Sequence, residues 1–251
     1  MAAGATWVGT SWKMTKTLAE SVAYARALAA VDSSRWAGTQ PFIIPPATAL
    51  AAVRDTLGHQ SQVLLGAQNA HWEDAGAWTG ELSVPQVADA GARLVEIGHS
   101  ERREHFGETD HTVNLKVRAA LRHGVRPLVC VGESDQVFRS GGSVEHVRRQ
   151  ARAALAGVGD PSQVLIAYEP VWAIGAGGRS ARPEDIAEVF AALRAEFGSA
   201  VEGLLYGGSV TLGNAAQTLK VPAVDGLFVG RAAWAVDDFI ALLDHVSGLS
   251  A

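Results

Sequence analysis

The chain has 251 residues, of which 48% are hydrophobic and 19% are charged. This length supports one large core, and the net charge of −5 argues against nucleic acid or an anionic membrane as the main partner. The one cysteine, Cys130, excludes an intramolecular disulfide framework and a zinc cluster built from cysteines. The first five residues lack a signal-peptide pattern, and no apolar run approaches the ~20 residues of a membrane span. We therefore expect a soluble protein of the reducing cytoplasm.

Short apolar runs alternate with longer amphipathic segments along the chain. The expected strands are residues 6–9, 42–44, 63–67, 94–97, 127–131, 164–168, 204–206 and 226–229. The expected helices include residues 18–30, 49–57, 115–123, 143–156, 183–197 and 236–246. The apolar runs are continuous rather than alternating with polar residues, which is typical of parallel strands that are covered on both faces.

The number and spacing of these units predict the fold. Eight units in 251 residues give about 31 residues each, the length of one strand and one helix. This spacing favours an α/β fold with a closed (β/α)₈ barrel, although counting alone also allows an open sheet with an extra strand. No linker or shift in composition interrupts the chain, so we expect a single domain over residues 1–251.

In such a barrel, the functional residues follow the carboxyl ends of the strands. Lys13 follows the first run, His99 the fourth and Glu169 the sixth. Glycine-bearing loops follow the sixth, seventh and eighth runs. The sequence thus predicts that a lysine, a histidine and a carboxylate meet at one rim.

His99 stands where a strand ends and a helical turn begins near Ser100. A histidine there also fits a capping or packing role. The positive end of a helix dipole would disfavour the imidazolium form, so the ring is expected to be neutral. A neutral imidazole can donate one N–H to a substrate carbonyl.

Glu169 ends an expected buried strand and is followed by Pro170. A structural salt bridge is one interpretation of such a carboxylate. The other is a general base whose pKa rises when a loop closes over it. The next residues favour the second interpretation, because Trp172 and Ile174 with glycines at 175, 177 and 178 resemble a lid with flexible ends. The lid lacks G-x-G-x-x-G spacing, so nucleotide binding is weakly indicated.

Residues 207–209 (GGS) and 230–231 (GR) follow the last two strands, where barrels of this class often bind phosphate through backbone N–H groups. Simple tight turns are the alternative. Lys13 would supply a positive charge for the anion. His105, Glu108 and His111 have the spacing of a metal-binding helix, but no further ligand is evident and we expect solvated polar residues. Cys130 is assigned no nucleophilic role.

At these residues the sequence resembles the triosephosphate isomerase family. The most specific matches are residues 97–103 (IGHSERR), 167–175 (AYEPVWAIG) and 206–210 (YGGSV), and further matches run in order along the chain at 12–13, 68–69, 78–81, 106–108 and 224–226. The resemblance covers essentially the whole sequence. It implies a (β/α)₈ barrel and an aldose–ketose or ketose–ketose isomerisation through a cis-enediolate, without a metal or an organic cofactor.

The resemblance also implies a role for individual residues, inherited from the family's known mechanism. Lys13 would bind the anionic substrate, His99 would polarise its carbonyl, and Glu169 would move the proton. Glu101 and Glu133 match carboxylates that support the contacting residues. Gly175, Ser209 and Gly230 match phosphate binders, and Thr79 matches a loop that enters a neighbouring subunit, which implies a homodimer.

Several residues depart from the family pattern. Ser11 stands where asparagine is usual, and Arg231 replaces the second glycine of the phosphate loop. Phe228 replaces a leucine, while Ala176 and Gly178 replace the threonine and lysine of the lid. Serine removes bulk where substrate lies, and an arginine beside a phosphate can add a charged contact.

This combination resembles a branch of the family that acts on tetrulose phosphates such as erythrulose phosphates. A four-carbon substrate is therefore favoured over a triose phosphate. Ordinary triosephosphate isomerase activity, the interconversion of dihydroxyacetone phosphate and glyceraldehyde 3-phosphate, is the alternative. A non-catalytic phosphate-binding barrel is a remote third, because Lys13, His99 and Glu169 are all present.

Overall fold

A computed structural model describes residues 4–175 and 178–249 and contains a closed barrel of eight parallel strands. Each strand pairs with the next one in the chain, and the eighth pairs with the first. The strands are β1 (Thr6–Ser11), β2 (Thr39–Ile44), β3 (Leu64–Ala67), β4 (Leu94–Ile97), β5 (Arg126–Val131), β6 (Leu165–Tyr168), β7 (Gly203–Tyr206) and β8 (Gly226–Val229). The predicted barrel is confirmed, and the open sheet is excluded.

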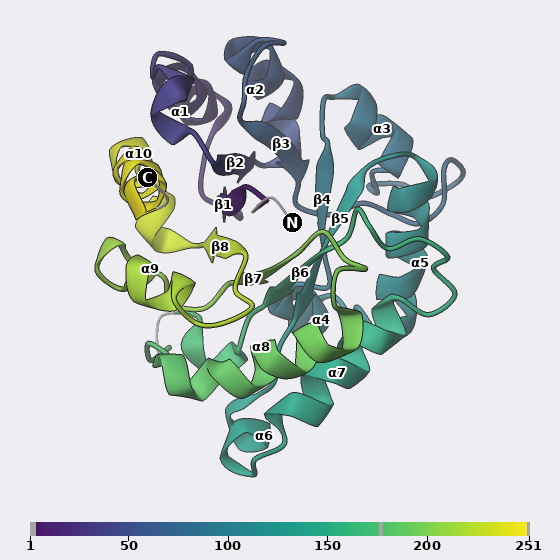
Figure 1. Cartoon of the computed structure of the whole chain (residues 1–251). Helices are drawn as coiled ribbons and strands as arrows, with labels where there is room; N and C mark the ends of the chain where they lie inside the picture. Colours follow the sequence, from purple (N-terminus) through teal and green to yellow (C-terminus); the bar gives the residue numbers. More distant parts are fainter. Residues whose placement is uncertain (1–3, 176–177, 250–251) are drawn as a thin grey trace.

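Helices surround the ring of strands, as Figure 1 shows. They are α1 (Leu18–Ala29), α2 (Leu50–Leu57), α3 (Val84–Asp89), α4 (Ser100–His105), α5 (Asp110–Arg122), α6 (Asp135–Arg139), α7 (Ser143–Ala154), α8 (Pro183–Phe197), α9 (Leu212–Leu219) and α10 (Val236–Leu249). The last helix, α10, packs beside α1, so the last unit of the barrel lies next to the first on its outer side.

The predicted strands all overlap observed ones, and the largest shift among the expected helices is at α5. This helix begins at Asp110, five residues before the expected start at 115. Thr109 caps it: its side chain accepts a hydrogen bond from the Thr112 backbone, and the Thr112 side chain accepts one from the Thr109 backbone. The capping pair extends the helix through polar residues that apolar periodicity does not detect.

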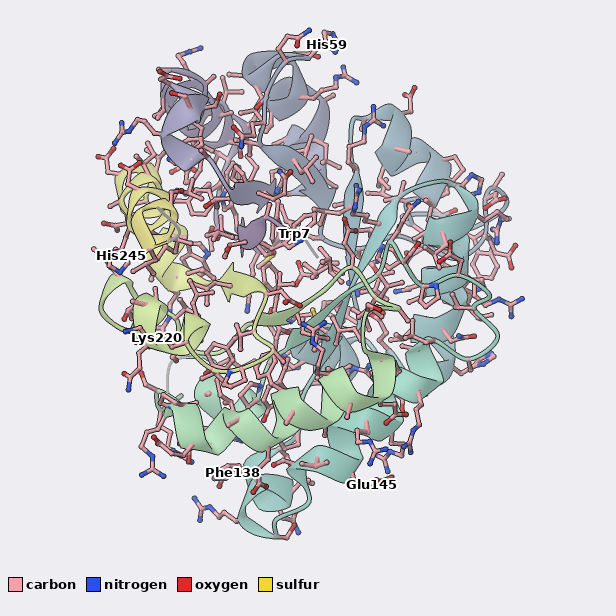
Figure 2. The ribbon with its side chains drawn as sticks, viewed as in Figure 1. Trp7, His59, Phe138, Glu145, Lys220 and His245 are labelled. Carbon is pink, nitrogen blue, oxygen red and sulfur yellow. The ribbon has the colours of Figure 1, made fainter. Side chains whose placement is uncertain are left out.

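Alternate residues of each strand face opposite sides of the barrel wall. In β1, Trp7 packs inside the barrel and Val8 packs outside against the helices. The interior cluster consists of Trp7, Phe42, Ile44, Leu94, Leu128, Cys130, Leu165, Ala167, Leu205 and Phe228. Figure 2 shows Trp7 in the middle of the barrel, whereas His59 and His245 lie at the periphery. The same alternation decides which residues at the strand ends face the barrel opening.

Among residues 4–175 and 178–249, no helix has the length and apolar character needed to cross a membrane.

Candidate active site

An open pocket of about 490 Å³ lies at the carboxyl ends of the strands. Nine of the residues predicted for the site line it: Ser11, Lys13, His99, Glu101, Glu169, Gly175, Ser209, Gly230 and Arg231. They lie at the carboxyl ends of five strands or in the segments that follow them, and closure of the barrel brings these segments together. Glu133 and Thr79 lie elsewhere.

Glu169 follows β6 and is 4% exposed. Its backbone N–H donates to the carbonyl of Val131 at 2.7 Å, which continues the pairing with β5. Two glycines give it room: a Cβ on Gly207 would lie 2.6 Å from the Glu169 Cγ, and one on Gly132 would lie 1.9 Å from its carbonyl oxygen. Burial, with the nearby charge of Glu96, raises the pKa of Glu169 to about 8. Such a carboxyl is a stronger base than an exposed one.

His99 precedes α4 and is 5% exposed. Its Nδ1 accepts a hydrogen bond from the Glu101 backbone N–H at 3.2 Å, so the proton of the neutral ring is on Nε2. Burial, and then the charge of Lys13, lowers the pKa of His99 to about 4. The ring is neutral as expected, and burial is the largest cause of its lowered pKa.

The Nε2 atom of His99 and Oε2 of Glu169 are 3.7 Å apart. This separation is too long for a hydrogen bond. Among the described residues, Oε2 of Glu169 has no hydrogen-bond partner. The Nε2–H of His99 and the carboxyl of Glu169 therefore both face the pocket and are not hydrogen bonded to each other.

Lys13 lies just past β1 with a φ of 52°, a left-handed conformation that is uncommon for a side-chain-bearing residue. The side chain of Gln68 donates to its carbonyl at 2.8 Å and holds this turn. Its Nζ donates to Oε1 of Glu101 at 2.6 Å. Glu101, expected to support the contacting residues, therefore lines the pocket itself and pairs with Lys13 directly.

The loops after β6, β7 and β8 are tied together at the pocket edge. Ser209 donates from Oγ to the carbonyl of Ala173 at 2.6 Å, and Arg231 donates to the carbonyl of Gly175 at 2.7 Å. Gly178 packs closely, since a Cβ there would lie 2.5 Å from the carbonyl oxygen of Ile174. A larger residue at position 178 would therefore clash with the backbone in this conformation. Ala176 lies outside the described residues.

Glu133 is fully buried behind the start of the lid rather than in the pocket. One of its oxygens accepts hydrogen bonds from Trp172 Nε1 at 2.8 Å, Tyr168 Oη at 3.1 Å and Ser143 Oγ at 3.1 Å. It thereby fixes the indole at the base of the lid. Thr79 lies in an exposed turn between β3 and α3, next to Trp78.

The expectation that Glu108 is solvated is wrong. Its side chain is buried, pairs with Arg102 at 2.8 Å and Lys116 at 3.1 Å, and accepts a hydrogen bond from the Gly98 backbone at 3.2 Å. It anchors the loop that carries His99, a long-range contact that sequence spacing cannot indicate. Within the described ranges, no group of three or more His, Cys, Asp or Glu residues could hold a metal ion.

Sequence analysis overlooked Glu96. This residue of β4 is 3% exposed and lines the pocket beside His99 and Glu169. The sequence did contain an indication of this residue. Glu96 interrupts the apolar run 94–97, and strand alternation places it on the same side as Leu94, which faces the barrel interior.

A basic buried carboxyl, a neutral imidazole and a lysine at the carboxyl end of a (β/α)₈ barrel define an enzyme that moves protons on an anionic substrate. The family model described as triosephosphate isomerase matches residues 6–246. The chain belongs to the triosephosphate isomerase family.

Relatives and a solved structure agree with this membership. The chain is 57% identical to an L-erythrulose-1-phosphate isomerase of Mycolicibacterium smegmatis, over 95% of this chain and 92% of that protein. It is 49% identical to a protein of the same name from Rhizobium etli, over 96% and 92% of the two chains. The crystal structure of triosephosphate isomerase from Bartonella henselae superimposes with a TM-score of 0.86 at 36% identity, over 96% of this chain and 98% of that one.

Proposed function

We propose that this protein isomerises L-erythrulose 1-phosphate. The observation that carries the isomerase chemistry is the arrangement of Glu169, His99 and Lys13 around one pocket. The four-carbon substrate is supported by two similarities, to proteins of Mycolicibacterium smegmatis and Rhizobium etli that bear the name L-erythrulose-1-phosphate isomerase. Both extend over more than nine-tenths of each chain.

The chemistry follows from the two facing groups. L-erythrulose 1-phosphate has its carbonyl at C2 and a hydroxyl on C3. Glu169 removes the proton from C3 while His99 Nε2–H donates to the carbonyl oxygen, which gives a cis-enediolate. The proton returns at C2, and the hydroxyl proton on O3 is lost as a new carbonyl forms at C3. The product is an isomeric ketose phosphate, and no electrons enter or leave.

The protonation states suit this reaction. With a pKa of about 8, roughly a tenth of the Glu169 carboxyls are ionised at pH 7 in the free enzyme. The charge of Lys13 acts in the opposite direction and favours the ionised base. His99 is neutral at the start of the reaction and neutral again at its end, because it donates one proton and regains one. An imidazolium would be a poorer acid–base group here, because the anionic intermediate would hold the second proton on the ring.

The phosphate is proposed to lie at the loops after β6 to β8. Gly175, Ser209 and Gly230 line this part of the pocket, where backbone N–H groups can bind an anion. Arg231 adds a guanidinium at the same edge. Its hydrogen bond to the Gly175 carbonyl couples the phosphate region to the start of the lid.

A triose phosphate is the second candidate, favoured by the family model and by the match to the Bartonella henselae structure. Ser11 distinguishes the two candidates, because it is buried at the pocket and its small side chain leaves space for a larger substrate. We therefore expect the four-carbon compound to react faster.

The test is a comparison of kcat/KM for L-erythrulose 1-phosphate and for dihydroxyacetone phosphate with the purified protein. We expect a clear preference for the four-carbon substrate. A strong preference for the triose phosphate would make the protein a triosephosphate isomerase.

We also propose that residues 1–251 form one domain that dimerises in the cytoplasm. Support comes from large apolar side chains exposed near the Thr79 turn and after β1: Trp78 is 47% exposed and Met14 is 97% exposed. Exposed apolar groups of this size are typical of contact surfaces. Sedimentation equilibrium would give a mass of two chains if the proposal is correct and of one chain if it is not.

A further inference from the structure

Glu96 forms part of the floor of the pocket, and the proposed proton transfer does not use it. It lies on β4 two residues after Leu94 and so faces the barrel interior, where the buried cluster consists of apolar residues. The pocket that it lines also contains His99, Glu169 and Ser11. Its charge raises the pKa of Glu169, so the two carboxyls are close enough to interact electrostatically.

A carboxyl at this position is costly, because burial in apolar surroundings disfavours its ionised form. Burial raises the pKa of Glu96 to about 7. In the part of the chain that the structure describes, no arginine, lysine or histidine forms an ion pair with it. The polar side chain next to it is Ser11, which is 4% exposed and whose hydroxyl lowers the pKa of Glu96.

Two other buried carboxylates of the chain have a different environment. Glu108 pairs with two cations, and Glu133 accepts three hydrogen bonds from side chains. Both therefore have strong partners within the fold, although among the described residues Oε2 of Glu133 has none. Glu96 and Ser11 line the open pocket instead. Over residues 4–175 and 178–249, the geometry gives the buried Ser11 hydroxyl no hydrogen-bond partner, and a buried polar group of this kind beside a pocket indicates a polar ligand.

We propose that Glu96 and Ser11 form a subsite for the terminal hydroxymethyl group of a four-carbon ketose phosphate, with the Glu96 carboxylate accepting a hydrogen bond from its hydroxyl. This inference rests on the proposed function and names the residues that select its substrate.

The position of the subsite matches the chemistry of the substrate. L-erythrulose 1-phosphate equals dihydroxyacetone phosphate with one hydrogen on the reacting carbon replaced by a hydroxymethyl group. That group must therefore lie beside the base that removes the proton. Glu96 lies beside Glu169, and Phe228 lines the same pocket and can cover the apolar face of the added carbon.

The test compares kcat/KM for L-erythrulose 1-phosphate and dihydroxyacetone phosphate in the wild type, Glu96→Gln and Glu96→Leu. A site built to hydrogen-bond a substrate hydroxyl discriminates by roughly 10⁴-fold or more against an analogue without it. We expect the ratio of the two kcat/KM values, four-carbon over triose, to fall at least a hundredfold in Glu96→Leu. A smaller fall is expected in Glu96→Gln, which keeps an oxygen acceptor. The melting temperature of Glu96→Leu should rise, because a buried carboxyl without a cation is removed.

Two matched controls lie outside the subsite. Glu108→Gln removes a buried carboxylate on the His99 loop, and Thr10→Ala removes a buried hydroxyl next to Ser11. Both should keep the wild-type substrate ratio even if they lower the melting temperature. An equal change of the ratio in Glu108→Gln would overturn the subsite.

The outcomes separate the two proposals. A wild type that does not prefer the four-carbon substrate contradicts the proposed function. A wild type that prefers it, with a ratio unchanged within threefold in both Glu96 variants, contradicts the Glu96 subsite alone. If Glu96→Leu does not fold, the substrate ratio of Glu96→Gln tests the subsite instead. A ratio equal to that of the wild type would then indicate that Glu96 has only a structural role.

Discussion

At the amino-terminal end of the barrel interior, Trp7, Leu94 and Leu165 belong to one buried apolar cluster. At the carboxyl end of the same strands, Glu96 and Glu169 are just as well buried, and within residues 4–175 and 178–249 neither pairs with a lysine or an arginine. The strands are continuous from one region to the other. One barrel wall therefore carries a region that stabilises the fold and, a few residues further on, a region whose buried polar groups reduce stability and can bind a ligand.

Replacing the base should have the largest effect, and it should lower activity without lowering stability. Glu169→Gln removes the group that accepts the proton, so kcat should fall about 10³-fold or more. The melting temperature at pH 9 should not fall, because an uncompensated buried charge is lost. Steady-state kinetics and thermal unfolding measure both quantities. A kcat within tenfold of the wild type would show that Glu169 is not the base.

A substitution at the amino-terminal end should have the opposite effect. Leu165 is fully buried in the interior cluster, so Leu165→Ala should reduce the free energy of unfolding by about 2–5 kcal/mol. The folded variant should retain kcat within a few-fold. Leu212→Ala, at a residue that is 50% exposed, is the control and should change stability by about 0.5 kcal/mol or less. A large loss of kcat in a folded Leu165→Ala variant would contradict the assignment of stability to one region and activity to the other.

The pH dependence of stability should show how much the ionisation of the buried Glu96 and Glu169 destabilises the fold. The folded pKa of Glu169 is about 8 and that of Glu96 about 7, both above the unfolded value, so the folded state binds more protons than the unfolded state between pH 4.5 and 8. Stability should therefore decrease as the pH rises, with the two carboxyls contributing about 3 kcal/mol between pH 6.5 and 9. His99 has the opposite slope, but most of it falls below this window, because its pKa is about 4 in the folded state and 6.5 in the unfolded state.

Urea unfolding at the two pH values measures this decrease. In the double variant Glu96→Gln/Glu169→Gln the decrease should be largely lost, while Glu108→Gln should keep it. A wild type that is equally stable at both values would mean that these carboxyls are not raised in pKa.

Much of this organisation could be predicted from the sequence. Repeated apolar runs set the number of strands, and the residues directly after them, such as His99 and Glu169, became neighbours once the barrel closed. The roles of Gln68 and Glu108 could not be predicted in this way, because their contacts depend on side chains that approach across the fold. The cause of the His99 pKa shift was also hidden, since burial is a property of the assembled site. Glu96 could have been found from strand alternation alone.

In the proposed mechanism Glu169 carries a proton between neighbouring carbons through an enediolate. The most direct measurement follows the reaction of L-erythrulose 1-phosphate in D₂O by NMR and mass spectrometry. A carboxyl that exchanges its proton with solvent should place deuterium on the carbon that was the substrate carbonyl, and Glu169→Gln should form no such product at a comparable rate. Product formed at full rate without deuterium at that carbon, in the wild type at any extent of reaction, would contradict the proton-transfer mechanism.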